Sequence, residues 1–365
     1  MKGECFKDKL EQAMRHASRM TSKNPSLPVL ACVLVEAKKG SLLVRATNID
    51  VSYEASVPAR VEKDGVVALS GAALTSFLSG SSAQNISFSS TAGGISVRVG
   101  NSNATFKVFP HEDFPNFSHP KESANQIPVS QVLSGLKSVL YSASMSSVRP
   151  ELSSIYIFSE GNGVVFVATD SFRLAEKHIT LQKNIQFTPT LVPAKNASEL
   201  LRVLSEMEQE LCFVSSEKGQ FAVQGGGMLF TSRTIDGSFP DYKQIIPKDF
   251  VTTITILRDD FLKALQLIAG LSEKSNQIVL NVPKEEGEIS LFVKNAEVGE
   301  GTSKIKAAVS GEPFEMSFNA RYLLDCLNAI SEPSVSLLFS GAAKPLMLTG
   351  TGNASFRYIV MPMNR

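Results

Sequence analysis

The sequence predicts an α+β fold built from three repeated blocks, and two observations lead to this prediction. Short helix patterns with apolar residues at i, i+3 and i+4 recur at 74–78, 200–204 and 323–327, with starts 126 and 123 residues apart. The motif Phe114-Pro115-Asn116-Phe117 near the end of the first block corresponds to Phe239-Pro240-Asp241-Tyr242 in the second. Repeats of this length indicate equivalent structural modules rather than an active site.

Each block begins with a longer amphipathic helix, which the apolar spacing predicts at 6–20, 129–143 and 257–271. In the first helix the apolar stripe consists of Leu10, Ala13, Met14 and Ala17. Lys7 and Arg15 lie off this stripe, so we expect positive charge on the exposed side of the helix.

Alternating apolar and polar residues after these helices predict strands. The expected strands are 30–35, 42–46 and 53–57 in the first block and 155–158 and 164–168 in the second. Turn signals at Lys38-Lys39-Gly40, Gly161-Asn162-Gly163 and Glu285-Glu286-Gly287 separate them and predict antiparallel hairpins. A second half-block of strands around the short helix follows, so each block holds two helices and antiparallel sheets.

The blocks divide the chain into three expected domains. These are an N-terminal domain at 1–120, a central domain at 126–248 and a C-terminal domain at 250–365. A chain of 365 residues with 43% hydrophobic residues is long enough to bury three cores. Polar or proline-containing segments at 118–127 and 246–250 are the expected linkers.

Composition narrows the function classes. The net charge is +1, from 36 basic and 35 acidic residues, so DNA contact by bulk positive charge is not expected and any such contact is local or topological. No run of 18 apolar residues and no signal-peptide pattern occur, which predicts a cytoplasmic protein without membrane contact. The four cysteines are far apart and lack metal-ligand spacing, so they are expected to be free thiols.

The sequence predicts no catalytic residue, no cofactor and no metal, because the usual nucleotide, zinc-protease and hydrolase motifs are missing. The glycine-rich segment 299–304 has the wrong order for a phosphate loop and is expected between two strands. Gly225-Gly226-Gly227 is expected to be a hairpin turn. Asp170 lies in 168–174, which resembles 46–50, so a structural turn with Asp170 capping backbone amides is predicted, with an acid or base role as the alternative.

Four short motifs occur in a fixed order along the chain. They are Leu27-Pro28-Val29-Leu30, Ala168-Thr169-Asp170 with Arg173-Leu174, Asp236-Gly237 before Phe239-Pro240-Asp241-Tyr242, and Val360-Met361-Pro362-Met363. With them the whole chain resembles the bacterial DNA polymerase III beta subunit family, the sliding clamps. The resemblance implies a DNA clamp fold of three domains per protomer and a head-to-tail ring of two protomers. It also implies a non-catalytic processivity factor that encircles duplex DNA without reading its sequence.

The resemblance implies four kinds of partner besides a second copy of the chain. They are double-stranded DNA, the replicative DNA polymerase, the clamp loader and other replication or repair proteins with a clamp-binding motif. It places a partner-peptide pocket between the second and third domains. By motif, the lining is Leu152, Thr169, Arg173, Leu174, Pro240, Ile245, Tyr322, Pro345, Ile359, Val360, Met361, Pro362 and Met363. Aliphatic and methionine side chains can repack around different peptides, while core packing remains the alternative for any one of them.

The resemblance also implies basic residues that face DNA and residues at the protomer contact. The candidate DNA-facing residues are Arg15, Arg19, Lys23, Lys137, Arg202, Arg258 and Lys263. An ordinary solvated helix face remains the alternative for each of them. Phe106 and Leu271 are the candidates at the homodimer interface, with core packing as their alternative.

The chain departs from the family pattern at three places. Ser171-Phe172 stands where well-studied members have Gly followed by His, and Gln244 stands where they have a basic residue. Asn364 precedes Arg365, where the family usually has a basic residue directly after the last Met. These departures leave the peptide preference open.

Two other function classes stay open. A three-domain β-rich binding module or surface adhesin without a DNA role would explain the repeats, although the helix that opens every block and the missing signal peptide argue against it. A hydrolase or nuclease acting from Asp170 and Asp241 would need a metal-binding carboxylate cluster.

Overall fold

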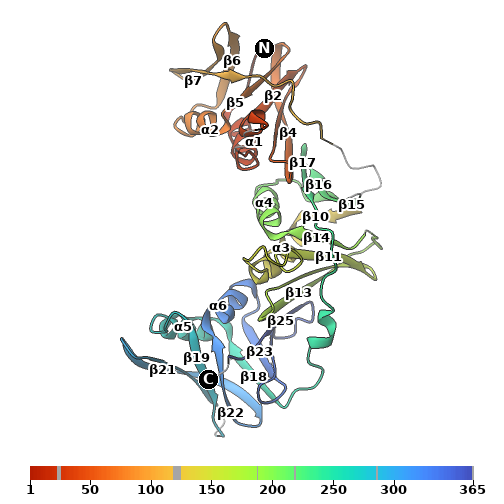
Figure 1. Cartoon of the computed structure of the whole chain (residues 1–365). Coiled ribbons are helices and arrows are strands. Elements are labelled where there is room, and N and C mark those ends of the chain that lie inside the picture. Colours follow the sequence, from red (N-terminus) through yellow and green to blue (C-terminus); the bar gives the residue numbers. More distant parts are fainter. Residues whose placement is uncertain (23–25, 118–124, 187, 218, 285–286, 364–365) are drawn as a thin grey trace. The chain divides into compact units, whose positions relative to one another are not determined.

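The computed structural model describes residues 1–22, 26–117, 125–186, 188–217, 219–284 and 287–363. Contacts divide the chain into two compact units. Unit 1 is Met1–Ser130 with Ser198–Thr234, and unit 2 is Gln131–Ala197 with Ile235–Arg365. Each unit is built on one antiparallel sheet with helices packed on it, which confirms the α+β fold class (Figure 1).

Unit 1 contains α1 (Lys7–Arg19), α2 (Gly71–Ser79), the short 3-10 helix η1 (Pro28–Ala31) and most of α4 (Ala194–Ser205). Its strands are β1 (Lys2–Phe6), β2 (Val33–Lys38), β3 (Ser41–Thr47), β4 (Val51–Lys63), β5 (Gly65–Leu69), β6 (Asn85–Thr91), β7 (Gly94–Val99), β8 (Ser102–Phe106), β9 (Val108–Phe109), β10 (Asn125–Pro128), β15 (Leu211–Glu217), β16 (Gln220–Gly225) and β17 (Met228–Arg233). The main sheet runs β10-β15-β16-β17-β4-β1-β6-β7-β8. Because β4 pairs with β17, strands of the first and second predicted blocks share one sheet.

Unit 2 contains most of α3 (Val129–Val139), η2 (Leu140–Ser142), η3 (Tyr242–Ile245), α5 (Arg258–Ala269) and α6 (Ala320–Ala329). Its strands are β11 (Ser154–Glu160), β12 (Gly163–Thr169), β13 (Arg173–Thr180), β14 (Thr190–Pro193), β18 (Thr252–Leu257), β19 (Gln277–Val282), β20 (Glu288–Asn295), β21 (Gly299–Gly311), β22 (Phe314–Asn319), β23 (Ser334–Phe339), β24 (Leu346–Gly350) and β25 (Phe356–Val360). The sheet order is β14-β11-β12-β13-β25-β24-β23-β18-β21-β20-β19-β22. Here β13 pairs with β25, so the second and third blocks are joined in the same way as the first two.

The sequence periods produce most of these elements. The predicted stripe of α1 is buried, with Leu10 and Met14 among its core residues, and the short helices at 74–78, 200–204 and 323–327 lie in α2, α4 and α6. Lys7 was expected on the exposed side, but it is buried. Its ammonium donates to the Ser81 carbonyl at 2.8 Å and pairs with the carboxylates of Asp8 and Glu11, both at 3.2 Å, which balance its charge.

Three local expectations need correction. Leu30 lies in η1 rather than in a strand, because Pro28 fixes the backbone at the start of a tight turn and β2 begins only at Val33. The second long helix ends as α-helix at Val139 and tightens into η2. The segment 299–304 begins β21 rather than lying between strands, so its backbone is committed to the ladder with β20. The expected turn at Gly225-Gly226-Gly227 is confirmed, with Gly226 and Gly227 at φ 59° and 73°.

The first predicted linker falls outside the described residues from 118 to 124, and its end forms the start of β10. In the part of the chain that the structure describes, no helix is long and apolar enough to cross a membrane. All four cysteines are buried and free.

Candidate functional site

A tight turn at residues 169–173 forms the centre of the candidate site in unit 2. The Thr169 hydroxyl donates to the Arg173 carbonyl at 2.6 Å, and Asp170 Oδ1 accepts the amides of Phe172 and Arg173, both at 3.0 Å. The capping role predicted for Asp170 is therefore confirmed. Ser171 has a φ of 80°, in the left-handed region that favours glycine. The turn leaves the Phe172 side chain 63% exposed.

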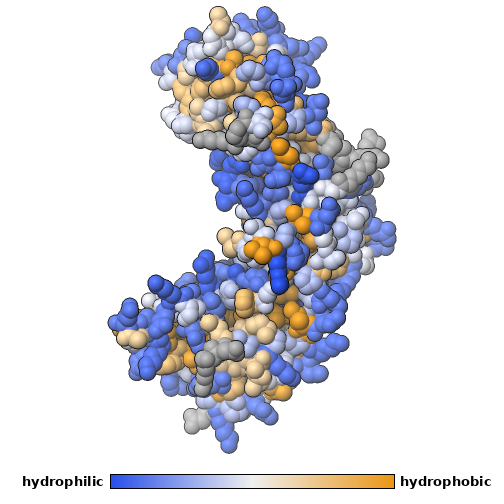
Figure 2. Space-filling view, in the orientation of Figure 1, coloured by the Kyte–Doolittle hydropathy of each residue, from blue (hydrophilic) through white to orange (hydrophobic). Residues whose placement is uncertain are grey.

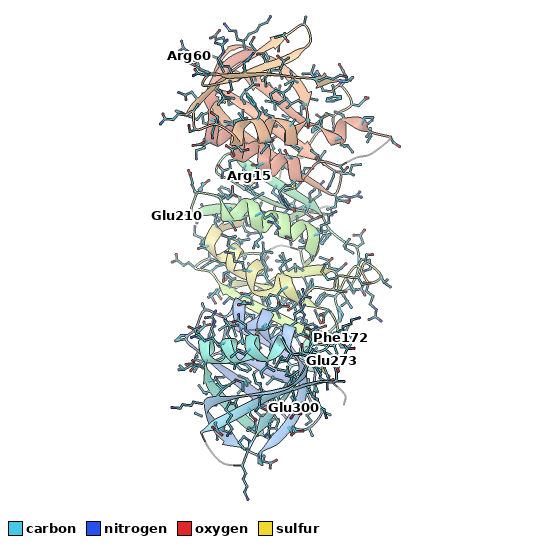
Figure 3. The ribbon with its side chains drawn as sticks, turned by 90° about the vertical axis from the view of Figure 1, so that its left-hand side faces the viewer. Arg15, Arg60, Phe172, Glu210, Glu273 and Glu300 are labelled. Carbon is cyan, nitrogen blue, oxygen red and sulfur yellow. The ribbon has the colours of Figure 1, made fainter. Side chains whose placement is uncertain are left out.

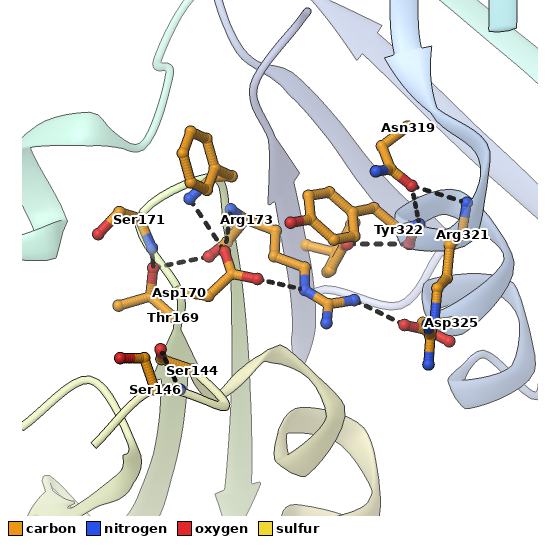
Figure 4. A network of polar contacts seen from close by, with 12 residues as sticks. Ser144, Ser146, Thr169, Asp170, Ser171, Arg173, Asn319, Arg321, Tyr322 and Asp325 are labelled. Carbon is orange, nitrogen blue, oxygen red and sulfur yellow. Dashed lines mark hydrogen bonds and ion pairs between the residues drawn. The ribbon is translucent and has the colours of Figure 1, made fainter. Parts of the chain in front are cut away.

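Arg173 connects this turn to α6. Its Nε donates to Asp170 Oδ2 at 2.9 Å and its Nη1 donates to Asp325 Oδ2 at 2.7 Å, as Figure 4 shows. The guanidinium also lies 4.2 Å from the centre of the Tyr322 ring, and only 10% of the side chain is exposed. Burial is the largest single effect and would lower the pKa of Arg173, but the hydrogen bond with Asp325, the charge of Asp170 and the contact with Tyr358 together raise it. Arg173 is thus a fixed cation.

The N-terminus of α6 positions the tyrosine beneath this cation. Asn319 caps the helix, and its Oδ1 accepts the amides of Arg321 at 3.0 Å and Tyr322 at 3.4 Å (Figure 4). The Tyr358 hydroxyl of β25 donates to the Tyr322 carbonyl at 2.9 Å. Tyr322 and Asp325 are three residues apart on one helix face, so both reach Arg173.

An apolar cluster underlies the turn. Its buried members are Val165, Val167, Leu174, Tyr242, Met347 and Ile359. Strand register explains this grouping, because Leu174 pairs with Ile359 and Arg173 pairs with Val360 across β13 and β25. Leu174, Ile359 and Val360 were predicted to line a pocket, and all three are almost completely buried. Their side chains therefore lie beneath the turn and contribute to the core.

Tyr242 anchors the η3 segment to this apolar cluster. Its hydroxyl donates to Glu176 Oε2 at 2.6 Å, and its amide donates to the Pro240 carbonyl at 2.8 Å. Burial and the hydrogen bond to Glu176 raise the pKa of Tyr242, so the phenol stays protonated and donates. The predicted residues Pro240 and Ile245 lie on either side of Tyr242, and both are exposed.

Glu176 is a buried carboxylate on β13 that is held by several partners. His178 Nε2 lies 3.1 Å from Oε1, and the Arg357 guanidinium lies 3.5 Å from it. Burial alone would raise the pKa of Glu176, but the close approach of His178, the hydrogen bond from Tyr242 and the charge of Arg357 lower it. The carboxylate is therefore ionised and keeps η3 attached to the sheet.

The C-terminal strand and its continuation supply the partly exposed rim. The Met361 amide donates to the Phe172 carbonyl at 2.8 Å, and the Met363 amide donates to the Ser317 carbonyl at 2.8 Å. Met361 is 39% exposed, whereas Pro345, Pro362 and Met363 are half-buried. Figure 2 shows hydrophobic side chains among hydrophilic ones on the visible face of unit 2. Exposed apolar groups beside a fixed cation suit a peptide-binding surface.

The remaining predicted pocket residues occupy buried positions. Thr169 is buried at the end of β12, where its hydroxyl belongs to the turn. Leu152 is buried in the loop before β11, and its carbonyl accepts the Ser144 amide at 2.8 Å. Sequence reasoning missed Asp325, Tyr242 and Glu176. The i, i+3 spacing of Asp325 from Tyr322 was a signal that could have found one of them.

The candidate DNA-facing residues lie on four helices. They are Arg15 and Arg19 on α1, Lys137 on α3, Arg202 on α4, and Arg258 and Lys263 on α5. Lys23 lies outside the described residues. Lys137 and Lys263 are exposed.

Several of these cations already have acidic partners. Arg15 pairs with Glu206 at 2.8 Å and Arg19 with Glu199 at 2.6 Å. Arg258 donates to the Leu327 carbonyl at 2.9 Å and pairs with its neighbour Asp259. The structure thus separates free cations from paired ones, a distinction that residue type alone does not make.

The two candidate protomer-contact residues lie in different units. Phe106 ends the edge strand β8, is half-buried and packs edge-on against Phe77 of α2 with ring centres 5.7 Å apart. Leu271 follows α5 and is also half-buried, in contact range of Gly301 on β21. Both retain some exposed surface.

The chain matches family models of three consecutive domains of the DNA polymerase III beta subunit. The N-terminal domain matches residues 1–118, the central domain 126–241 and the C-terminal domain 243–364. The chain belongs to the DNA polymerase III beta subunit family. The sequence-based identification of the family is therefore confirmed.

Relatives of this chain extend over the same length. The beta sliding clamp of Synechococcus elongatus is 28% identical, with 100% of this chain and 99% of the relative covered. The beta sliding clamp of Caulobacter vibrioides is also 28% identical, with 97% of each chain covered. In the solved Caulobacter crescentus DNA polymerase III beta structure the identity is 26% and the TM-score 0.89, with 100% of both chains covered. The Thermotoga maritima beta subunit has the same fold, with a TM-score of 0.93 at 21% identity, covering 100% of this chain and 99% of that one.

The departures of this chain from the family pattern lie at the exposed side of the site. Phe172 projects from the turn, and Gln244 donates to Asp241 Oδ2 at 2.6 Å instead of supplying a positive charge. Asn364 and Arg365 lie outside the described residues. Asp170 and Asp241 are engaged in turn contacts, and among the described residues no three His, Cys, Asp or Glu side chains are grouped to hold a metal ion.

Proposed function

We propose that this chain encircles duplex DNA as a head-to-tail ring of two copies and tethers the replicative DNA polymerase to it. The observation that carries the proposal is the succession of three beta subunit domains along one chain. As a member of this family the chain is a sliding clamp, a non-catalytic processivity factor of DNA polymerase III. We keep domain boundaries at 1–120, 126–248 and 250–365, which the three matched segments support.

Tethering explains why the chain needs little positive charge. A polymerase attached to a ring on DNA has a high effective concentration at the primer end, without any new contact to the bases. Escape then requires the ring to open rather than phosphate contacts to break. The net charge of +1 is compatible with this mechanism, and the exposed Lys137 and Lys263 are the simplest candidates for weak phosphate contacts.

The partner-peptide surface in this proposal is the rim around Arg173. Phe172, Ile245 and Met361 are the exposed apolar residues there, and the Asp170–Arg173–Asp325 network fixes its polar centre. The partners are the replicative polymerase, the clamp loader and other proteins with a clamp-binding motif. A related Caulobacter crescentus clamp, 27% identical with a TM-score of 0.91, has polyethylene glycol at a region proposed for beta-motif tethering, which supports such a surface.

A head-to-tail ring requires two different end surfaces on one chain. Phe106 on edge strand β8 and Leu271 after α5 are the proposed residues of these surfaces. Their partial exposure in the single chain leaves apolar area for a second copy to cover. The cytoplasm is the proposed location, where the partners act on DNA.

Retention on DNA tests the ring directly. The purified protein is loaded with a clamp loader and ATP onto nicked circular DNA, and retention is measured before and after linearisation. Loss only after linearisation is expected, because a ring slides off an open end. Equal retention on both forms would mean contact binding and would overturn the topological mechanism.

Peptide binding tests the rim. Met361→Glu is expected to weaken binding of a fluorescent polymerase-tail peptide by about tenfold, since it places a charge among the apolar anchors. Val298→Glu is the matched control, because Val298 is also an exposed aliphatic residue of unit 2. Equal effects of the two changes would argue against this surface.

A further inference from the structure

A row of ion pairs joins α1 to α4 and the segment after it within unit 1. The row has three pairs at 2.6 to 2.9 Å: Arg19 with Glu199, Arg15 with Glu206, and Lys9 with Glu208. Figure 3 shows Arg15 at the side of α1 that adjoins the green helix α4. We call these contacts the α1–α4 ion-pair row.

Glu206 is the centre of this row. Besides Arg15, its carboxylate contacts His16 Nε2 at 3.0 Å and Gln12 Nε2 at 3.4 Å, and Gln12 also donates to the Glu206 backbone carbonyl at 3.1 Å. His16 is buried, and its ring packs near Tyr53 with centres 5.9 Å apart. One carboxylate therefore contacts three side chains of α1, those of Gln12, Arg15 and His16.

The cations of the row remain accessible to solvent. The side chains of Lys9, Arg15 and Arg19 are 48%, 51% and 43% exposed. Ion pairs with this exposure contribute about 0–1 kcal/mol each to stability, so they open easily. The row therefore adds little to folding stability.

The row nevertheless changes how α1 meets a phosphate. An unpaired arginine at a DNA surface releases about one counterion, whereas an arginine already neutralised by a carboxylate releases fewer. Lys137 on α3 and Lys263 on α5 provide an internal contrast, because no carboxylate among the described residues forms an ion pair with either lysine. The candidate arginines of α1, α4 and α5 are thus paired, whereas these two lysines have no such partner among the described residues.

We propose that Glu199, Glu206 and Glu208 compete with DNA phosphates for the cations of α1 and so keep the contacts of this helix weak and exchangeable. This inference rests on the proposed function, because it requires that α1 faces the encircled duplex. Each phosphate contact then forms by exchange with an internal carboxylate, and each is lost by the reverse exchange. Sliding benefits because no single contact becomes strong enough to hold the ring in one place.

Charge-neutral substitutions test the competition. Glu199→Gln with Glu206→Gln is expected to tighten binding of the unloaded protein to a linear duplex by about three- to tenfold at 0.1 M salt. The plot of log Kd against log salt is expected to steepen by about one counterion. Loaded rings are expected to diffuse more slowly along DNA in single-molecule tracking.

Glu62→Gln is the matched control. It removes one negative charge from unit 1 and breaks the 2.7 Å pair with Lys2, so it is compared with Glu199→Gln and Glu206→Gln made singly, each of which also removes one charge. Its affinity and diffusion are expected to match those of the wild type. Adding Arg15→Ala and Arg19→Ala to the Glu199/Glu206 variant is expected to abolish the gain in affinity, because the released cations are then absent.

Two results would overturn the inference. One is unchanged affinity, salt slope and diffusion in a Glu199/Glu206 variant that unfolds at the wild-type temperature. The other is weaker binding together with a lower unfolding temperature, which would assign the row a structural role. Failure of the proposed function gives a different result, because the wild-type protein itself would then stay bound after the circular DNA is linearised.

Discussion

Two turns, one in each unit, have the same hydrogen bonds between side chains and the backbone, but their surroundings differ. In the first turn (47–51) the Thr47 hydroxyl donates to the Val51 carbonyl at 2.8 Å, and in the second turn (169–173) Thr169 donates to the Arg173 carbonyl at 2.6 Å. Asn48 Oδ1 accepts two amides in the first turn, as Asp170 Oδ1 does in the second. The central residues have φ 81° and 80°. The two repeated sequence segments therefore share individual hydrogen bonds as well as the course of the chain.

The difference lies in the last residue of each turn. Val51 is a buried core residue on β4, whereas Arg173 forms ion pairs with Asp170 and Asp325 and stacks on Tyr322. The same backbone thus continues the core in unit 1 and holds a polar centre in unit 2. The two turns differ in side chains rather than in fold, and in unit 2 those side chains form the polar centre.

The largest expected effect is the loss of the polar centre. Arg173→Ala should lower the free energy of unfolding by about 3 kcal/mol, because Asp325 and Asp170 lose a partly buried partner. Urea unfolding followed by circular dichroism measures this. Asp325→Asn in the Arg173→Ala background should restore about 1 kcal/mol, since it removes an uncompensated charge. Additive losses from the two changes would contradict the coupling.

Removing the hydroxyl that both turns share tests their equivalence. Thr47→Val and Thr169→Val should each lower the free energy of unfolding by about 1–2 kcal/mol, because each loses the hydrogen bond donated to a carbonyl and the one accepted from an amide. Thr47→Val also loses the hydrogen bond accepted from the Ser52 hydroxyl. Hydrogen exchange of the amides in β4 and β13 reports the two sites separately. A loss confined to one turn would show that the shared geometry is not energetically equivalent.

Backbone strain gives a smaller effect. Ser171→Ile copies the first turn and should cost about 1 kcal/mol, because β-branched residues are disfavoured at positive φ. Phe172→Ile is the control, since the next position is also exposed and has no positive φ. Thermal unfolding of both variants measures the difference. If the control loses as much stability, the cost does not come from the left-handed backbone.

The smallest expected effect is the difference between the two units in how their folding stability depends on pH. Burial lowers the pKa of His16 despite the opposing carboxylate of Glu206, and the charges of Arg15 and Arg19 add to the decrease. The buried Tyr53 of β4 also faces the His16 ring. The folded state of unit 1 therefore binds fewer protons than the unfolded chain. The contribution of neutral His16 to the free energy of unfolding is complete above the unfolded histidine pKa of about 6.5. It is lost as the pH falls below that value.

Glu176 in unit 2 responds in a lower range. Its folded pKa is lowered, so its contribution is present above the unfolded value of about 4.3 and is lost as the pH falls through the folded pKa. As the pH falls from 7.5 to 5.5, the unfolding temperature should therefore decrease slightly because of His16 in unit 1. In His16→Gln the unfolding temperature should depend less on pH over this range. An unchanged slope in this variant would exclude His16 as the source.

The candidate site was only partly predictable. Thr169, Asp170 and Arg173 stand in one local motif, and their turn follows from hydrogen bonds between residues at most four apart. The partner of Arg173 is Asp325, which is 152 residues away in sequence. Local patterns carry no information about such a pair, and the same holds for the hydrogen bond from Tyr242 to Glu176.

The sequence by itself determined the α+β class, the threefold repeat, the helices and the two turns, because these depend on apolar period and on short-range hydrogen bonds. Only the tertiary structure decided which polar residues are available. Arg15 and Arg19 look like free surface cations in sequence, yet Glu206 and Glu199 neutralise them across helices. The physical reason is that the charge a partner meets depends on what lies within about 4 Å, and folding brings distant residues within that range.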